Sequence, residues 1–261
     1  MLIRVLTAGG PLDTALVRTA VRATGVRDHV DVRLLLDVRW FEPYVKTVDA
    51  LAAHWTPTET DEATAAFLAE LDAKLDQYAL ICAEGSASFT TRRALAVPET
   101  EVTRAMRESD LVMLPHPGGE SAEVRRAFAQ AIASPTSPLL VVAVNDQART
   151  ATVVSETARH VNGTTDMVLR ALLDGKVDRI AVEPPAEVER FRSMAPIVEP
   201  VPKRSRVGEH SPGDAPGDLR VVMGASQAGG PFGWARMARR RLEPERSLLL
   251  LPAKSRRGKR A

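Results

Sequence analysis

Short apolar runs alternate with longer amphipathic stretches along the first part of the chain. The apolar runs are the length of strands, and the stretches between them repeat apolar residues at helical spacing. This alternation predicts an α/β fold, in which a mostly parallel sheet is flanked by helices. The expected strands are residues 2–6, 31–38, 93–97, 111–114 and 139–144, with 80–82 as the alternative to the favoured 93–97. The expected helices are residues 12–24, 61–78, 99–108 and 120–132.

A second series of elements follows. It contains a long stretch rich in proline, glycine and charge at residues 203–218, which predicts an exposed loop. The expected strands are residues 151–155, 177–184, 219–224 and 247–253, and the expected helices are residues 165–174, 186–194 and 234–242.

The two series end with the same order of features. Residues 110–143 and 218–253 each contain an aspartate, an apolar strand, a Gly-Gly loop, a helix, a serine or proline break and a final apolar strand. This repetition predicts a tandem duplication with a first domain at residues 1–146 and a shorter second domain at 147–261. Each domain is expected to hold a mostly parallel five-stranded sheet, and the second ends in a basic tail.

Composition and charge narrow the class of protein. The 261 residues carry a formal net charge of +2 with both signs interspersed, so nothing in the balance requires a nucleic acid or a membrane as partner. We interpret the basic C-terminal tail as a solubilising segment, with a nucleic-acid arm as the alternative. A single cysteine, Cys82, suits a reducing compartment, and no run is long enough to span a membrane. The apolar start is too short for a signal peptide, so we expect a cytoplasmic protein.

Two stretches carry a family resemblance. Residues 97–119 (VPETEVTRAMRESDLVMLPHPGG) and 221–230 (VVMGASQAGG), with SLLLLP at 247–252, resemble the tandem two-domain form of the universal stress protein family. The resemblance implies an architecture of the adenine-nucleotide α-hydrolase type. It also implies ATP-binding loops in which GxxG is followed nine residues later by Gly-Ser or Gly-Thr, and an aspartate that ends the first strand. Glycines let backbone N–H groups approach phosphate oxygens.

Both halves depart from that glycine pattern. In the first half Leu114 and Pro117 stand where the first two glycines are expected, and proline has no N–H to offer. In the second half Gly224 matches, but Gln227 and Met237 replace the other glycines. Neither first strand ends in an aspartate. The resemblance therefore implies degenerate ATP-binding motifs.

The candidate nucleotide-binding residues follow apolar strands, where open α/β sheets bind their ligands. Two other readings stay open: the glycines form turns that need positive φ, and Asp13 caps a helix. The arginines at 236 and 239–241 are interpreted as solvated, with neutralisation of an anion as the alternative. The candidates are Thr7, Gly9, Gly10, Asp13, Gly118, Gly119, Gly224, Gly229 and Gly230.

Catalytic and metal-binding motifs are missing from the sequence. There is no Walker A motif and no G-x-S-x-G nucleophile elbow. His116 has no second histidine or cysteine nearby in sequence, so no metal site is predicted. Cys82 lies in the apolar setting ALICA and is interpreted as a buried small hydrophobic residue. We expect no catalytic residues.

Three hypotheses of function follow. The first is a universal-stress-like regulatory or binding protein with weak or no ATP binding, which acts through contacts with an unidentified protein. The alternative is a nucleotide-binding protein for ATP or AMP with weak hydrolase activity, and the third is an enzyme on the wider nucleotide-binding α/β architecture. The sequence requires no cofactor, and ATP or another adenine nucleotide is the candidate. The apolar runs at 139–144 and 247–252 are expected to cover each other in an intramolecular pseudo-dimer, and a homodimer stays open.

Overall fold

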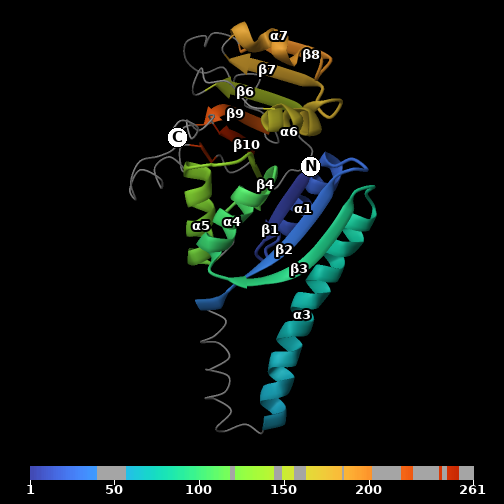
Figure 1. The fold of residues 1–261 in the computed structure, drawn as a ribbon, viewed down its shortest axis with the longest axis vertical. Coiled ribbons are helices and arrows are strands. Elements are labelled where there is room, and N and C mark those ends of the chain that lie inside the picture. The colour runs from blue at the N-terminus through green and yellow to red at the C-terminus, as the bar shows by residue number, and fades with distance from the viewer. Residues whose placement is uncertain are drawn as a thin grey trace, which may run out of the picture.

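One continuous sheet organises the protein (Figure 1). It has ten strands in the order β3-β2-β1-β4-β5-β10-β9-β6-β7-β8, with helices packed on it. This confirms the predicted α/β fold class, a large and mostly parallel sheet flanked by helices. The computed structural model describes residues 1–39, 57–117, 121–143, 149–155, 163–183, 185–201, 219–225, 241–242 and 246–252.

The first half of the sheet contains the five expected strands, all parallel to their neighbours. The alternative strand at residues 80–82 is wrong, because these residues lie in the last turns of a long helix. The third strand begins at Ser88, earlier than predicted, because its first five residues are mostly polar and exposed, and Phe89 is the one apolar residue among them. The strands are β1 (Leu2–Thr7), β2 (His29–Asp37), β3 (Ser88–Ala96), β4 (Leu111–Pro115) and β5 (Leu139–Val142).

The helices of this half also follow the predicted pattern. Pro98 occupies the first turn of its helix, where its missing N–H costs no hydrogen bond. The longest helix starts before and ends after its predicted bounds, and Figure 1 shows it extending well beyond the edge of the sheet. The helices are α1 (Asp13–Ala23), α3 (Pro57–Ala83), α4 (Pro98–Glu108) and α5 (Ala122–Ala133).

The second half has shorter elements. One strand, β8 (Ile197–Pro200), was not predicted, because its four residues are exposed or half-buried and show no apolar run. The helix expected at 186–194 is a 3₁₀ turn, η1 (Pro185–Glu187), followed by a single α-turn. The expected loop at 203–218 and residues 234–240 of the expected last helix lie outside the described residues. The other elements are β6 (Thr150–Ser155), α6 (Gly163–Leu173), β7 (Arg179–Glu183), α7 (Val188–Phe191), β9 (Leu219–Ala225) and β10 (Ser247–Pro252).

The two halves meet at an antiparallel strand pair. β5 and β10 pair with Leu140 opposite Leu249, whereas every other pair of neighbouring strands is parallel. The apolar runs expected to cover each other are thus hydrogen-bonded neighbours within one sheet. Counted outward from this seam, β10-β9-β6-β7-β8 repeats the connectivity of β5-β4-β1-β2-β3. The boundary at residue 146 stays a prediction, because residues 144–148 lie outside the described residues.

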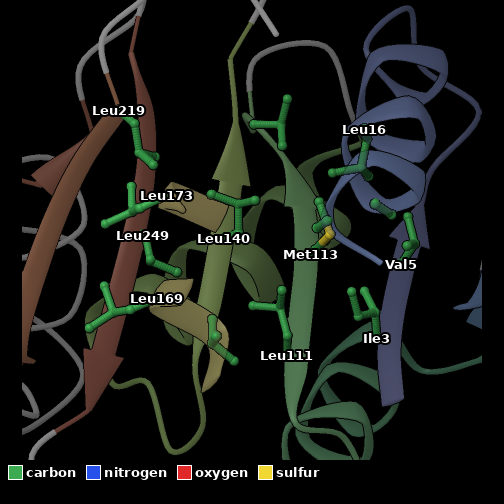
Figure 2. Close-up of a cluster of buried hydrophobic side chains, with 14 of the residues drawn as sticks. Ile3, Val5, Leu16, Leu111, Met113, Leu140, Leu169, Leu173, Leu219 and Leu249 are labelled. Carbon is green, nitrogen blue, oxygen red and sulfur yellow. The ribbon is translucent and has the colours of Figure 1, made fainter. Parts of the chain in front are cut away.

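Apolar side chains fill both faces of the sheet. On one face, α1, α3 and α6 cover a cluster that runs without a break across the seam, from Val5 through Leu140 and Leu249 to Leu173 (Figure 2). On the other face, α4 and α5 cover a second cluster around Phe128. Alternate residues of each strand serve the two faces, as the two-residue period of a strand requires.

Polar contacts reinforce the seam. The Ala143 N–H donates to Ser247 Oγ at 3.2 Å. Arg241 Nη1 donates to the carbonyls of Ile132 at 2.7 Å and Ala133 at 3.2 Å, at the C-terminal end of α5. The interpretation of Arg241 as solvated is therefore wrong, since it is 4% exposed. Its partners lie in the other half of the chain, where local sequence spacing gives no signal.

Cys82 is 2% exposed, and burial raises the pKa of its thiol to about 11. The thiol is therefore protonated at neutral pH, and the residue packs as a small hydrophobic side chain. Within the described ranges, no helix has the length and apolar character needed to cross a membrane. The remaining arginines of the 236–241 group lie outside the described residues.

Replacing Arg241 by methionine tests the seam. Arg241→Met keeps an apolar stem but removes the donors to the α5 carbonyls, and we expect the free energy of unfolding to fall by about 1.5–3 kcal/mol. Urea denaturation measures the change. The control is Arg126→Met on the exposed face of α5, which we expect to change stability by less than about 0.5 kcal/mol. Equal effects of the two variants would contradict the capping role.

Candidate functional site

The loop after β1 brings together the first group of predicted site residues. Thr7 ends the strand, Gly9 and Gly10 form the turn, and Asp13 starts α1. The backbone N–H of Asp13 donates to the Gly10 carbonyl at 3.3 Å, which closes the turn. The loop lies at the carboxyl end of a parallel strand, as expected for a ligand site of an open α/β sheet.

Gly9 has a backbone conformation that requires glycine. Its φ is +81°, a left-handed value that side chains rarely adopt. The Gly9 carbonyl accepts a hydrogen bond from Lys74 Nζ at 3.3 Å, and a Cβ at this position would lie 3.4 Å from the same nitrogen. Lys74 on α3 therefore holds the loop from outside.

Asp13 holds the loop from inside. Its carboxylate oxygen Oδ2 accepts the Gly9 N–H at 2.7 Å and the Tyr78 hydroxyl at 3.0 Å, and the residue is 1% exposed. Burial and the neighbouring Asp13 carboxylate raise the pKa of Tyr78, so the phenol stays protonated and donates. A buried carboxylate thus already occupies the inside of the loop. Leu12 is the N-cap of α1, so Asp13 bonds upstream instead of capping the helix.

Thr7 faces away from solvent. It is fully buried, and its hydroxyl donates to the Arg33 carbonyl of β2 at 3.3 Å. The structure thus places Thr7, Gly9, Gly10 and Asp13 together, and their binding of a nucleotide stays a prediction. Lys74 and Tyr78 were not foreseen, because they come from α3, far along the chain, and carry no motif.

The second group of predicted residues is described only at Gly224. This residue has a φ of +64°, the positive value that was expected, but it lies within the strand β9 and not in a turn. The register of the β9–β10 pair shifts at Gly224 itself, because Met223 lies opposite Leu251 and Ala225 lies opposite Pro252. The remaining candidates, Gly118, Gly119, Gly229 and Gly230, lie outside the described residues.

His116 directly follows β4, at the same end of the sheet as the loop after β1. Its backbone N–H donates to the Val142 carbonyl at 2.9 Å. Its ring atom Nε2 is buried and has no hydrogen-bond partner among the described residues, and burial lowers the pKa of the imidazole, which is therefore neutral at pH 7. Where the structure describes side chains, no three His, Cys, Asp or Glu residues gather closely enough to hold a metal ion.

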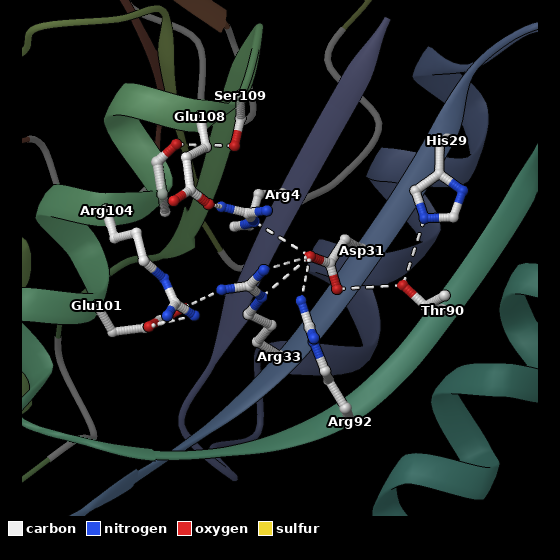
Figure 3. Close-up of polar contacts among 11 residues, drawn as sticks. Arg4, His29, Asp31, Arg33, Thr90, Arg92, Glu101, Arg104, Glu108 and Ser109 are labelled. Carbon is white, nitrogen blue, oxygen red and sulfur yellow. Dashed lines mark hydrogen bonds and ion pairs between the residues drawn. The ribbon is translucent and has the colours of Figure 1, made fainter.

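A buried charge cluster lies on the α4 face of the sheet (Figure 3). Asp31 Oδ2 accepts from Arg33 Nη2 at 2.7 Å and from Arg4 Nε at 3.1 Å, and Arg33 pairs in turn with Glu101 of α4. All four side chains are nearly inaccessible to solvent. Each charge has a partner of opposite sign, as buried charges require. Because the partners come from different elements, these ion pairs join α4 to β1 and β2.

More exposed side chains surround this cluster. Arg92 reaches Asp31 at 3.2 Å, Arg104 reaches Glu101 at 2.9 Å, and Glu108 accepts from Arg4 at 2.7 Å. Burial alone would raise the pKa of Asp31, but the hydrogen bonds and charges of Arg33 and Arg92 hold it below its ordinary value. The four buried side chains pair with one another and with the surrounding charged residues, which indicates a structural role.

This cluster was not predicted from the sequence. Its signal is two charges of opposite sign, Asp31 and Arg33, two residues apart in an otherwise apolar strand. That spacing places both on one face of a strand, so an ion pair within the core was readable in principle. Their partner Glu101 comes from a helix, which the local pattern does not reveal.

The fold resembles that of solved structures at low sequence identity. A universal stress protein from Archaeoglobus fulgidus DSM 4304 matches with a TM-score of 0.51 and 11% identity, over 96% of this chain and 98% of that one. The cytoplasmic domain of a prokaryotic cation chloride cotransporter matches with a TM-score of 0.48 and 12% identity, over 97% and 95% of the two chains. No protein-family model and no curated protein sequence matches. The first likeness shows a universal-stress-protein-like fold.

Removing the Tyr78 hydroxyl tests the closed loop. Tyr78→Phe takes one donor from the buried Asp13 carboxylate, so we expect the free energy of unfolding to fall by about 1.5–3 kcal/mol. Denaturant unfolding measures it. Asp76→Asn, at an exposed position of α3, is the control and should change stability by less than about 0.5 kcal/mol. A neutral Tyr78→Phe would mean that the hydroxyl does not hold Asp13.

Asp31 provides a test by pH. Its folded pKa is lowered, so its stabilising contribution is present above the unfolded value of about 3.9 and is lost as the pH falls through the folded pKa. Asp31→Asn should cost about 3–5 kcal/mol at pH 7, because it leaves buried arginines without their carboxylate.

The measurement is urea denaturation from pH 7 down to about pH 3, with Asp31→Asn expected to show a shallower loss of stability below about pH 4 than the unsubstituted protein. The matched control is Asp178→Asn, whose ion pair with Arg149 is exposed. Parallel pH profiles for Asp31→Asn and the unsubstituted protein would refute the assignment.

Proposed function

We propose that this chain is a universal-stress-like regulatory or binding protein that binds ATP weakly or not at all and acts through contacts with another protein. One observation carries the proposal: the Asp13 carboxylate accepts the Gly9 N–H at 2.7 Å inside the loop after β1. An N–H held by an internal carboxylate is not available to a phosphate, and the two anions repel each other.

The strand beside β1, β4, and the residues after it support the same view. Leu114, at the position of the first glycine of the family pattern, is fully buried and packs in the second apolar cluster. Pro117, at the position of the second glycine, has no N–H for a phosphate oxygen. Together with Asp13, these residues leave the first half poorly suited to a triphosphate.

The tandem form is part of this proposal. The repeated strand order on the two sides of the seam supports a duplication of one five-stranded unit. In this proposal the two units form an intramolecular pseudo-dimer, act in a stress-related role and work in the cytoplasm. The fold shared with the universal stress protein of Archaeoglobus fulgidus is the basis for the stress-related role.

The alternative function, a nucleotide-binding protein with weak hydrolase activity, has one observation in its favour. Gly224 matches the first glycine of the family pattern, and near the end of β9 it has a positive φ, a conformation that favours glycine. If a nucleotide binds, we therefore expect it in the second half, next to β9.

Thermal unfolding with ATP, ADP or AMP and magnesium separates the two functions. A ligand at about 100 times its dissociation constant stabilises the folded state by about 2.7 kcal/mol, which raises the melting temperature by several degrees. We expect no shift at millimolar nucleotide. A shift, accompanied by release of phosphate from ATP, would replace the proposal by the alternative.

Two glycine variants locate the nucleotide if a shift appears. Gly224→Ala should abolish the shift if the second half binds. Gly175→Ala is the matched control, because Gly175 also has a positive φ, of +66°, and a Cβ there meets no atom within 4 Å. Both variants carry similar backbone strain, so only a loss of the shift confined to Gly224→Ala assigns the site.

A further inference from the structure

A cavity of about 450 Å³ lies where the C-terminal ends of α1 and α6 approach the seam. Its apolar lining includes Leu140 of β5, Leu172 of α6 and Leu219 of β9. These residues come from both halves of the sheet, so the cavity is formed by their junction. Cavities of roughly 300–1,000 Å³ are typical of small-molecule sites.

This cavity is separate from the loop after β1. The loop lies at the N-terminal end of α1, whereas Arg22 and Ala23, which line the cavity, lie at the other end. An eleven-residue helix is about 16 Å long. A ligand in the cavity would therefore not contact Gly9 or Asp13.

Cations gather in the lining. Arg22, Arg149 and Lys176 line the cavity, and no acidic residue is among its described lining residues. Lys176 Nζ donates to the Arg22 carbonyl at 2.5 Å and also to the Ala171 carbonyl. It thus joins the C-terminal ends of α1 and α6 and offsets their partial negative charge.

Arg149 can turn toward a ligand. Its side chain is 81% exposed and pairs with the exposed Asp178 at 3.2 Å. A surface pair of this kind contributes little to stability, so a bound anion can replace Asp178 at small cost. Ser247 adds a hydroxyl group that accepts the Ala143 N–H at 3.2 Å, which leaves its own O–H as a donor.

We propose that this cavity binds an amphipathic anion, namely an unbranched fatty carboxylate. Leu140, Leu172 and Leu219 would take the alkyl chain, and the cations with the Ser247 hydroxyl would take the carboxylate. A neutral lipid would leave the cations unused. A nucleotide would place a polar base on leucine side chains that offer it no hydrogen bond.

Isothermal titration calorimetry of the full chain with decanoate, below its micelle concentration, tests the proposal. We expect saturable binding of decanoate, and much weaker binding of decanol and of the decyltrimethylammonium cation. No binding of decanoate, or equal binding of decanoate and decanol, would overturn the proposal.

Variants place the binding in this cavity. Leu172→Trp, at a half-buried lining position, fills the space and should abolish decanoate binding. The double variant Arg22→Ser with Arg149→Ser leaves the apolar lining intact and should weaken binding at least about fivefold. Arg170→Ser is the matched control, an exposed arginine of α6 outside the lining, and should bind as the unsubstituted protein does. Unchanged affinity in the Arg22/Arg149 variant would overturn the proposal even if Leu172→Trp does not fold.

Discussion

The antiparallel pairing of β5 with β10 is the constraint on which the structure depends. Both strands are almost wholly buried, and either one alone would be an open, apolar sheet edge. Pairing satisfies their backbone groups and sets Leu140 against Leu249 at the centre of a cluster that crosses the junction. Because both halves contribute to that cluster, neither is expected to retain its packing when the other is unfolded.

Charged side chains add specific contacts to the apolar packing. Arg241 and Lys176 reach from the second half to carbonyls at the C-terminal ends of α5 and α1, where a cation is favourable. Farther from the seam, Asp31 and Arg33 join α4 to the sheet. Both kinds of contact are directional, so they define the positions of helices that apolar packing alone would hold loosely. Asp13 acts in the same way on the loop after β1, because its carboxylate accepts the Gly9 N–H.

Much of this fold was readable from sequence, because long elements carry a local period. The apolar runs of β1, β4 and β5 and the amphipathic faces of α1 and α4 were recognised within a few residues of their bounds. The loop after β1 was also located, since Gly9 and Gly10 interrupt the pattern directly after an apolar run. The strand β8 was not predicted, because its four residues are exposed or half-buried and show no alternation of apolar and polar positions. The partners of Asp13 and Arg241 were not predicted either, because Tyr78 and the α5 carbonyls lie far away in sequence.

Hydrogen exchange tests the central role of the seam most directly. Alternate backbone amides of β5 and β10 point across the junction and the others point to β4 and β9, so exchange of the cross-junction amides requires the junction to open. If the halves form one cooperative unit, these amides exchange as slowly as those of β1 and β4, through global unfolding alone. Exchange of the β5 and β10 amides well before those of β1 and β4 would show a junction that opens while each half stays folded, and would contradict the account.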